Sequence, residues 1–232
     1  MQKETNKPMK KITILTGHYG TGKTNYAVNL ALELAADRKP VTVVDLDIVN
    51  PYFRTADFGT LFSEHQITLI APDYANSNVD IPALSFDLEQ IAAQDGYLII
   101  DVGGDDAGAI ALGRYAEALS AYADDMDMLY VINCYRYLTR TPEELLQYMR
   151  EIECAARMQH TGIVNNSNLG SETTAETITA SIPLAEQLAV AAGLPLLYTN
   201  FDKRLAMSGD GLHPVTVHVL PLWEQKPASD IL

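Results

Sequence analysis

The stretch GHYGTGKT, residues 17–24, decides the fold of this chain. It matches the phosphate-binding pattern G-x-x-x-x-G-K-[ST], in which glycines let backbone N–H groups wrap closely around phosphate oxygens. The apolar stretch KITILTG at 11–17 comes before it, and apolar residues at helical spacing follow from Ala27 to Ala35. Because a phosphate loop joins a strand to a helix, this context favours nucleotide binding over a chance glycine turn.

Outside this stretch, short apolar runs alternate with segments of helical periodicity. Further strands are predicted at 41–47, 67–72, 97–104, 126–136, 194–201 and 214–222, and 161–170 is predicted to be a strand that runs into an asparagine-rich loop. Further helices are predicted at 80–94, 107–123, 141–158 and 183–193. Such alternation is typical of a parallel sheet covered on both faces. The expected fold class is therefore α/β, with one mainly parallel β-sheet flanked by helices, as in phosphate-loop nucleotide-binding folds.

Several helix ends are marked by their residues. Thr141 and Glu144 form a capping box, and Pro142 stands at the first helical position between them. Asp80 is the expected N-cap of the helix at 80–94. Gly193 lies where a helix ending in a left-handed glycine would place it.

The length of 232 residues suits one domain. We expect a flexible N-terminus at 1–10, a nucleotide-binding domain at 11–225 and a C-terminal tail at 226–232. Ligands of a parallel sheet bind at the carboxyl ends of its strands. Polar residues collect at those ends, which predicts a binding site there.

The formal net charge of -14 repels nucleic acid and anionic lipid, so neither is expected as a partner. The two cysteines, Cys134 and Cys154, form no C-x-x-C pair, which fits a reducing cytoplasm. No apolar run reaches the ~20 residues that span a bilayer. The start, MQKETNKPMKK, lacks the apolar core of a signal peptide. We therefore expect a cytoplasmic location.

Four residues are candidates for the chemistry of a bound nucleotide. Lys23 can reach the β- and γ-phosphates, and the hydroxyl of Thr24 can hold Mg²⁺. Asp101 follows the apolar run YLII and supplies a carboxylate for the same ion. Asp47 ends VVDLD and can orient an attacking water. The candidate catalytic residues are Lys23 and Asp47, and the candidate metal ligands are Thr24, Asp47 and Asp101.

Taken together, GKT, DLDIVNP and IIDVGGDDAG resemble the deviant-Walker-A family of P-loop ATPases. That family includes MinD, ParA, the nitrogenase iron protein, Mrp-type cluster carriers and CobQ/CobB synthetases. The resemblance runs from about Lys11 to Gly170 and implies ATP or ADP and Mg²⁺ as ligands. DLDIVNP looks like switch I, which implies that Asp47 positions water. DVGGDDAG is similar to switch II of the iron protein.

Two loops contain the residues expected to contact the base of the nucleotide. NNSN at 165–168 resembles the family's base-recognition loop, which implies that Asn166 contacts adenine. YTNFD at 198–202 stands where the second base-contacting loop falls, and Asn200 lies within it. NNSN lacks the Lys and Asp of the guanine signature N-K-x-D, which favours adenine. The residues expected to bind the nucleotide are Gly17, His18, Gly20, Thr21, Gly22, Lys23, Thr24, Asn25, Asn166 and Asn200.

The loop departs from the family at His18, which stands where relatives carry a signature lysine. In the family this lysine crosses a dimer interface to the partner's phosphates, so a homodimer stays an open alternative. An arginine near a strand end can offset the missing charge. The candidates are Arg54, Arg114, Arg136 and Arg140, with Arg54 preferred.

Two further departures concern cofactors and membranes. Gly108 stands where the iron protein has a cluster-binding cysteine, so no iron–sulfur cluster is expected. The chain ends in PLWEQKPASDIL, unlike the basic amphipathic helix of MinD, so no membrane docking is expected.

The function predicted from these patterns is an ATP-binding protein and slow Mg²⁺-dependent ATP hydrolase. It would act as a nucleotide switch, or as an assembly or maturation factor, for an unidentified partner protein. The alternative is an ATP-dependent small-molecule synthetase or kinase of the CobQ or dethiobiotin synthetase type.

Overall fold

The computed structural model describes residues 9–47, 55–71, 88–137 and 139–219. Eight parallel strands form one sheet in the order β3-β2-β4-β1-β5-β6-β7-β8. The strands are β1 Ile12–Thr16, β2 Val41–Leu46, β3 Thr68–Ile70, β4 Tyr97–Val102, β5 Met126–Ile132, β6 Gly162–Asn165, β7 Leu196–Asp202 and β8 Leu212–Val215. β1 therefore lies between β4 and β5, and the loops after these three strands open on the same edge of the sheet.

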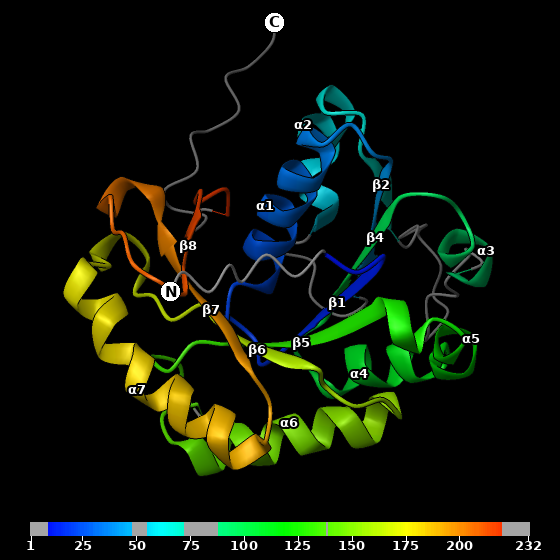
Figure 1. Cartoon of the computed structure of the whole chain (residues 1–232). Helices are drawn as coiled ribbons and strands as arrows, with labels where there is room; N and C mark the ends of the chain where they lie inside the picture. Colours follow the sequence, from blue (N-terminus) through cyan, green and yellow to red (C-terminus); the bar gives the residue numbers. More distant parts are fainter. Residues whose placement is uncertain (1–8, 48–54, 72–87, 138, 220–232) are drawn as a thin grey trace, which may run out of the picture.

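Helices cover both faces of this sheet, as Figure 1 shows. One face carries α1 Lys23–Ala36 and α2 Gly59–Glu64. The other carries α3 Leu88–Ala92, α4 Asp106–Gly113, α5 Ala116–Ser120, α6 Pro142–Ala156 and α7 Ala175–Ala192. The predicted α/β class with one helix-flanked parallel sheet is confirmed.

Two apolar clusters fill the space between sheet and helices. On one face, Leu15, Tyr26 and Phe62 are fully buried among residues of α1 and α2. On the other, Ile14 and Tyr130 pack beneath α4 to α7. Alternate residues of β1 thus point into opposite clusters, and every residue of β1 is buried because both sides are covered. This double packing makes β1 a rigid support for the loop that follows it.

The predicted ends of two helices are confirmed. Thr141 Oγ1 accepts the N–H of Glu144 at 3.2 Å, and the Glu144 carboxylate accepts the N–H of Thr141 at 3.2 Å. Gly193 closes α7 with φ 66°. However, α7 begins at Ala175, behind a cap at Thr174, rather than at Pro183, which lies inside the helix.

The helix predicted at 107–123 is broken into α4 and α5, so that prediction is wrong. α4 ends at Gly113, and the Arg157 guanidinium donates to the Gly113 carbonyl. A Cβ at Gly113 would overlap the carbonyl of Ala155 on α6. The close approach of α6 therefore ends the helix, a tertiary effect that local periodicity does not contain.

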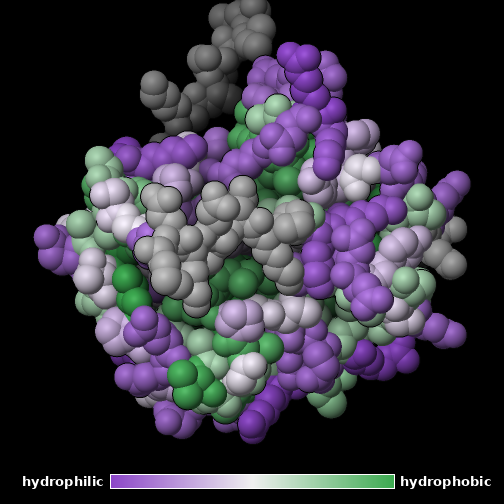
Figure 2. All heavy atoms as spheres, viewed as in Figure 1, coloured by the Kyte–Doolittle hydropathy of each residue, from purple (hydrophilic) through white to green (hydrophobic). Residues whose placement is uncertain are grey.

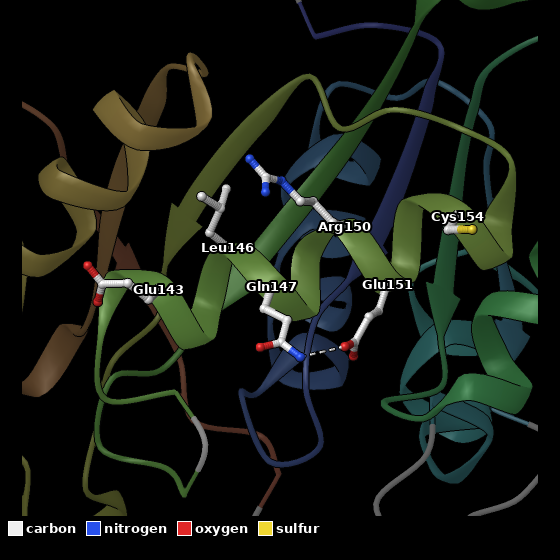
Figure 3. A pocket seen from close by; sticks show the side chains of 6 residues that line it. All are labelled: Glu143, Leu146, Gln147, Arg150, Glu151 and Cys154. Carbon is white, nitrogen blue, oxygen red and sulfur yellow. Dashed lines mark hydrogen bonds between the residues drawn. The ribbon is translucent and has the colours of Figure 1, made fainter.

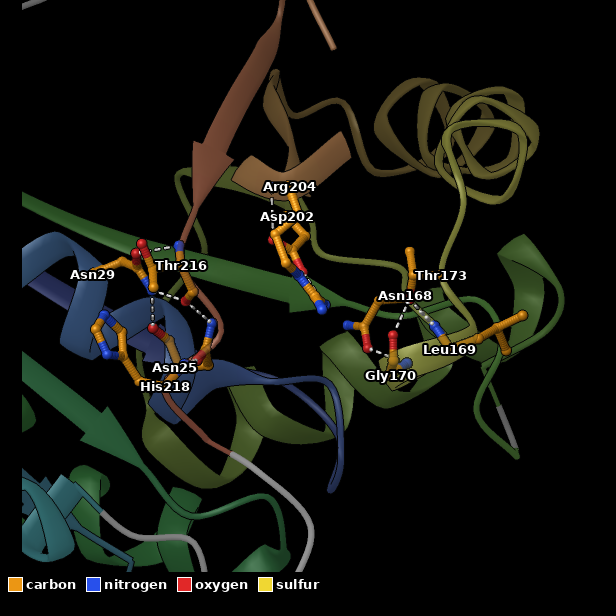
Figure 4. Close-up of polar contacts among 10 residues, drawn as sticks. All are labelled: Asn25, Asn29, Asn168, Leu169, Gly170, Thr173, Asp202, Arg204, Thr216 and His218. Carbon is orange, nitrogen blue, oxygen red and sulfur yellow. Dashed lines mark hydrogen bonds and ion pairs between the residues drawn. The ribbon is translucent and has the colours of Figure 1, made fainter. Parts of the chain in front are cut away.

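The strand predicted at 214–222 is shorter than expected, because β8 ends at Val215. After it, the Thr216 N–H donates to Asn29 Oδ1 at 2.7 Å, and the Thr216 carbonyl accepts from the amides of Asn25 and Asn29. Asn25 Oδ1 also accepts the N–H groups of His218 (Figure 4) and Val219. Side chains of α1, rather than a neighbouring strand, therefore bond the backbone of residues 216–219. We call these four residues the strap.

Some predictions fall on residues outside the described ranges. They include Asp80, Arg54, most of DLDIVNP, the first residues of the chain and its tail. The strand predicted at 126–136 ends at Ile132. β6 ends at Asn165, where the predicted asparagine-rich loop begins.

Hydrophilic residues dominate the molecular face seen in Figure 2, with hydrophobic residues in separate groups. Exposed apolar side chains in the described ranges include Tyr19 at the phosphate loop and Tyr137 in the loop after β5. Within those ranges no helix combines the length and the apolar character needed to cross a bilayer.

Candidate functional site

A cavity of about 780 Å³ lies at the carboxyl ends of the strands. One end is formed by the phosphate loop and the loops after β2, β4 and β5. The other end is formed by the loops after β6, β7 and β8, including the strap. Predicted site residues that line it are Gly20, Gly22, Lys23, Thr24, Asn25, Asp47, Asn166 and Asn200. Gly17, His18, Thr21 and Asp101 belong to the adjoining loop and strand.

The phosphate loop needs its glycines for two different reasons. Gly20 and Gly22 have φ angles of 77° and 82°, which favour glycine. A Cβ at Gly22 would in addition overlap the side-chain nitrogen of Asn166. α1 begins at Lys23, directly after the loop, so its first-turn N–H groups face the cavity end without intrahelical acceptors. The loop can thus bind an anion through its backbone.

Lys23 is buried and supplies the cation at this end of the cavity. Its Nζ donates to the carbonyl of His18 at 3.2 Å. Burial lowers the pKa of Lys23, and the nearby carboxylates of Asp101, Asp47 and Asp105 raise it in return. An ammonium enclosed by the loop and facing carboxylates is suited to bind phosphate oxygens.

Two hydroxyl groups converge on Asp101. Thr24 Oγ1 donates to Asp101 Oδ2 at 2.8 Å, and Thr55 Oγ1 donates to the same oxygen. The other oxygen, Oδ1, is buried without a partner among the described residues. Burial raises the pKa of Asp101, against the lowering effects of Thr55, Lys23 and Thr24. An unpaired buried carboxylate oxygen beside a threonine hydroxyl is an arrangement that fits a divalent cation.

No group of three or more His, Cys, Asp or Glu residues in the described ranges is placed to hold a metal ion. At nucleotide sites Mg²⁺ takes most of its ligands from phosphates and waters, and the protein adds one or two. Thr24 Oγ1 and the Asp101 carboxylate, which lie 2.8 Å apart, are groups that could make that contribution.

Asp47 lies against Gly103, which follows β4 in the segment DVGGDDAG. Its N–H donates to Asp45 Oδ1 at 2.9 Å, and Asp45 is fully buried. A Cβ at Gly103 would lie 3.2 Å from Asp47 Oδ1, so Asp47 rests on Gly103. Asp47 therefore borders the same end of the cavity as Lys23, while Asp45 holds the backbone that carries it.

Gly104 and His18 both contact Tyr148 of α6. The Tyr148 hydroxyl donates to the Gly104 carbonyl at 2.9 Å. The ring of His18 lies against the ring of Tyr148, with centroids 4.9 Å apart. A Cβ at Gly104 would lie 2.7 Å from the backbone of Tyr19, so Gly104 packs on the phosphate loop. His18 is thus turned toward its own α6.

Two hydrogen bonds between amide groups, each with a fixed donor and acceptor, link the phosphate loop to the far end of the cavity. The Thr21 carbonyl can only accept, so Asn166 must present its Nδ2, at 2.7 Å. Asn166 Oδ1 then accepts from Asn200 Nδ2 at 3.1 Å. Asn200 Oδ1 is left buried without a partner in the described part of the chain. The carbonyl of Thr21 therefore fixes Asn200 with an unpaired acceptor at the cavity wall.

Two other polar side chains at this end, Asn168 and Asp202, are already bonded (Figure 4). Asn168 Oδ1 accepts the N–H of Gly170 at 3.1 Å, and its Nδ2 donates to the Asn166 carbonyl at 2.8 Å. The carboxylate of Asp202 accepts from the backbone N–H and the guanidinium of Arg204. Asn200 differs from these two residues because its Oδ1 is a buried acceptor without a partner among the described residues.

Beneath the loop, a buried histidine connects β1 to α6. His160 Nδ1 lies 3.0 Å from Glu153 Oε1, so it carries the proton, and Nε2 accepts from Thr16 Oγ1 at 2.7 Å. Thr16 directly precedes Gly17, and the His160 ring also packs on Tyr130. Burial lowers the pKa of His160, and Glu153 only partly offsets this.

Acidification should therefore destabilise the protein through His160. The unfolded histidine takes up a proton near pH 6.5 but the buried one does not, so stability falls as pH drops below that value. The contribution of His160 to the free energy of unfolding falls by at most about 1.4 kcal/mol per pH unit. Urea unfolding between pH 7.5 and 5.5 should show a smaller loss in His160→Gln than in the wild type. Equal losses in both, or the same change in the exposed-site control His65→Gln, would contradict this.

A separate depression lies on the outer side of α6, away from the cavity. Figure 3 shows its lining residues, Glu143, Leu146, Gln147, Arg150, Glu151 and Cys154. Gln147 donates to Glu151 at 2.9 Å. Its side chains all come from one helix face, and it brings none of the predicted site residues together.

Sequence reasoning missed two residues of the site: Thr55, which contacts Asp101, and Tyr148, which contacts Gly104. Arg136, one of the four candidate arginines, lies on Gly20. Thr55 follows Asp47 by eight residues, and a hydroxyl shortly after switch-like DLDIVNP was the available signal. Nothing in the periodicity of α6 distinguishes Tyr148 from its neighbours.

No protein-family model and no curated protein matches this chain. Among solved structures, it is similar to FtsY of Thermotoga maritima, a cell division protein, with 20% identity, TM-score 0.59, and coverage of 84% of this chain and 62% of that one. It is similar to the signal recognition particle receptor FtsY of Elizabethkingia anophelis in complex with GDP, with 15% identity, TM-score 0.55 and coverage of 88% and 61%. It is also similar to the 54 kDa signal recognition particle protein of Aeropyrum pernix in complex with GDP. Here the identity is 14%, the TM-score is 0.52, and the match covers 83% of this chain and 42% of that one.

At these identities the likeness shows the fold alone, which is that of P-loop nucleoside triphosphatases. This chain spans about three fifths of the length of the FtsY structures that it matches. The comparisons do not support the finer resemblance to MinD and ParA, because the similar structures are FtsY and the 54 kDa signal recognition particle protein.

Proposed function

We propose that this protein binds and slowly hydrolyses a purine nucleoside triphosphate, with ATP as the substrate and Mg²⁺ as the cofactor. One observation carries the proposal. The buried Asp101 oxygen has no partner among the described residues, and it lies beside Thr24 and Lys23 of a complete phosphate loop. A loop that binds only a structural anion has no need of an unpaired buried carboxylate.

Thr24 and Asp101 would hold the metal ion. When bound, Mg²⁺ neutralises charge on the phosphates and makes the terminal phosphorus easier to attack. Lys23 would bind phosphate oxygens, and the loop N–H groups would hold the phosphate chain. Asp47, which borders the same end of the cavity, would orient the attacking water.

ATP is favoured by the groups at the base end. Adenine offers a 6-amino group as donor, which matches the single unpaired acceptor of Asn200. Guanine is usually read by a carboxylate that accepts from both N1 and the 2-amino group. In the described ranges, the carboxylate lining this end is Asp202, and Arg204 already occupies it.

GTP is the second candidate. Two similar structures, FtsY of Elizabethkingia anophelis and the 54 kDa protein of Aeropyrum pernix, are described in complex with GDP. Calorimetric titration with non-hydrolysable ATP and GTP analogues, with Mg²⁺, decides between the two. We expect the ATP analogue to bind about tenfold more tightly or better. Tighter GTP binding favours the second candidate, and no binding of either contradicts the proposal.

A switch role is supported by the path from the cavity to α6. Gly104 packs on the loop beside Lys23, and Tyr148 holds its carbonyl. A terminal phosphate at Lys23 would have to alter this contact, and α6 would carry the change to a partner protein. The same interpretation follows from the resemblance of DVGGDDAG to a switch II segment. Hydrogen exchange on α6 with ATP analogue and with ADP tests it, because equal protection in both states would argue against a switch.

Base selection should depend on Asn200. Purine riboside triphosphate lacks the 6-amino group, so we expect wild type to bind it about 5- to 150-fold more weakly than ATP, as for one unmade buried hydrogen bond worth about 1–3 kcal/mol. In Asn200→Leu the ratio of the two affinities should fall to near one. The ratio is the readout, because losing the bond to Asn166 lowers both affinities alike. A wild-type ratio kept in the variant would refute this role.

A further inference from the structure

We propose that Arg136 is a phosphate-binding residue supplied from within the chain, which contacts the triphosphate at the mouth of the phosphate loop. The inference rests on the proposed function, since it assigns a second cation to the same site. Arg54 was the arginine preferred from the sequence, but it lies outside the described ranges. Arg136 follows β5, the strand next to β1.

The side chain of Arg136 is laid on the phosphate loop itself. Its Nε donates to the Gly20 carbonyl at 3.0 Å. A Cβ at Gly20 would lie 3.5–3.8 Å from Nε, Cδ and Cζ of Arg136, so the guanidinium covers this glycine. Gly20 therefore provides a flat contact for the arginine as well as the turn of the loop.

The remaining donors of Arg136 are available for a ligand. A guanidinium has five N–H groups, and the bond to Gly20 uses one of them. Within the described ranges, no carboxylate lies within ion-pair distance of it. Arg136 lines the same cavity as Lys23 and Asp47. Its fork geometry suits phosphate oxygens.

The backbone that carries Arg136 is held in place. Its N–H donates to the Asn133 carbonyl at 3.2 Å, and the buried Thr139 hydroxyl donates to the carbonyls of Asn133 and Arg136. The Asn133 side chain bonds Tyr135 and Asn168. A side chain on a fixed turn loses less freedom on binding than one on a free loop.

The carboxylates at the phosphate-loop end of the cavity outnumber its buried lysine, so a second cation would favour phosphate binding. Lys23 stands against three carboxylates, Asp101, Asp47 and Asp105, before any phosphate enters. His18 packs on Tyr148, so it does not extend away from the chain toward a partner's site. Arg136 supplies positive charge at the loop without a second chain.

Other arginines near strand ends are less suited. Neither Arg114 nor Arg140 lines the cavity, and both are surface residues of the described chain. Arg204 lines the opposite end, where it pairs with Asp202. Arg140 is close in sequence to Arg136 and is also exposed, which makes it a matched control.

The test is calorimetric titration of the full chain with Mg²⁺ and either a non-hydrolysable ATP analogue or ADP. For Arg136→Ala we expect about 10- to 100-fold weaker binding of the analogue, as for a charged hydrogen bond worth about 1.5–3 kcal/mol. The loss for ADP should be smaller. Arg136→Lys should restore part of the affinity, because lysine keeps the charge but not the fork. Arg140→Ala should bind like wild type.

Unchanged affinity in Arg136→Ala, or an equal loss in Arg140→Ala, overturns the proposal. If Lys23→Ala loses binding while Arg136→Ala keeps it, the role of Arg136 alone fails. If the wild type binds neither the analogue nor ADP, the proposed function fails and this proposal with it.

Discussion

Lys23→Ala is expected to weaken the binding of an ATP analogue roughly 30- to 4,000-fold, the equivalent of about 2–5 kcal/mol for removing one member of a buried charged contact. The size follows from the enclosure of the ammonium, which is 7% exposed and lies among the carboxylates of Asp101, Asp47 and Asp105. Without it, the incoming phosphates would face those carboxylates with no intervening charge. Calorimetric titration with and without Mg²⁺ measures the loss.

The control is Lys39→Ala, which removes an exposed lysine that lies over the ring of Tyr97, outside the cavity. It should bind the analogue like wild type. Far-UV circular dichroism and the urea midpoint establish that Lys23→Ala keeps the fold. Binding within threefold of wild type by a folded Lys23→Ala would contradict the phosphate role, since it would mean that the loop backbone alone holds the ligand.

The layout of the fold was predictable because its signals are local. β1, the loop and α1 follow one another directly, and a single motif contains all three. The capping box of Thr141 and the left-handed Gly193 act over a few residues as well. A parallel sheet buried on both faces leaves continuous apolar runs, which makes its strands visible in the sequence.

The parts that were not predictable depend on contacts between distant residues. Asn25 and Asn29 hold the strap through Thr216, which lies 191 and 187 positions further along the chain. Gly113 ends α4 because of the approach of α6, and Arg157 bonds its carbonyl. Side chains that bond distant backbone groups leave no periodic trace in the sequence.

Within the site, residue types were predictable and their partners were not. Asn166 and Asn200 were both assigned to the nucleotide, but the direction of their hydrogen bonds depends on the Thr21 carbonyl. That direction leaves the unpaired acceptor on Asn200. In the same way, Arg136 could be named among four arginines, yet only its position on Gly20 distinguishes it.

Asp101→Asn should remove the effect of Mg²⁺ on triphosphate binding. Asparagine keeps an oxygen for the hydroxyls of Thr24 and Thr55 but loses the negative charge that a divalent cation needs. We expect the wild type to bind the ATP analogue at least about tenfold more tightly with Mg²⁺ than with EDTA, and the variant to bind equally in both. Asp95→Asn, the same change in an exposed residue just before β4, should behave like wild type.

The two variants separate the roles of neighbouring groups. Lys23→Ala should lower affinity both with Mg²⁺ and with EDTA, because its ammonium contacts phosphate directly. Asp101→Asn should lower only the affinity measured with Mg²⁺. Burial raises the pKa of Asp101, against the lowering effects of Thr55, Lys23 and Thr24, so a further cation at its unpaired oxygen would favour the charged carboxylate. If Asp101→Asn lost affinity equally in EDTA, Asp101 would act by holding Lys23, and the metal role would have to be given up.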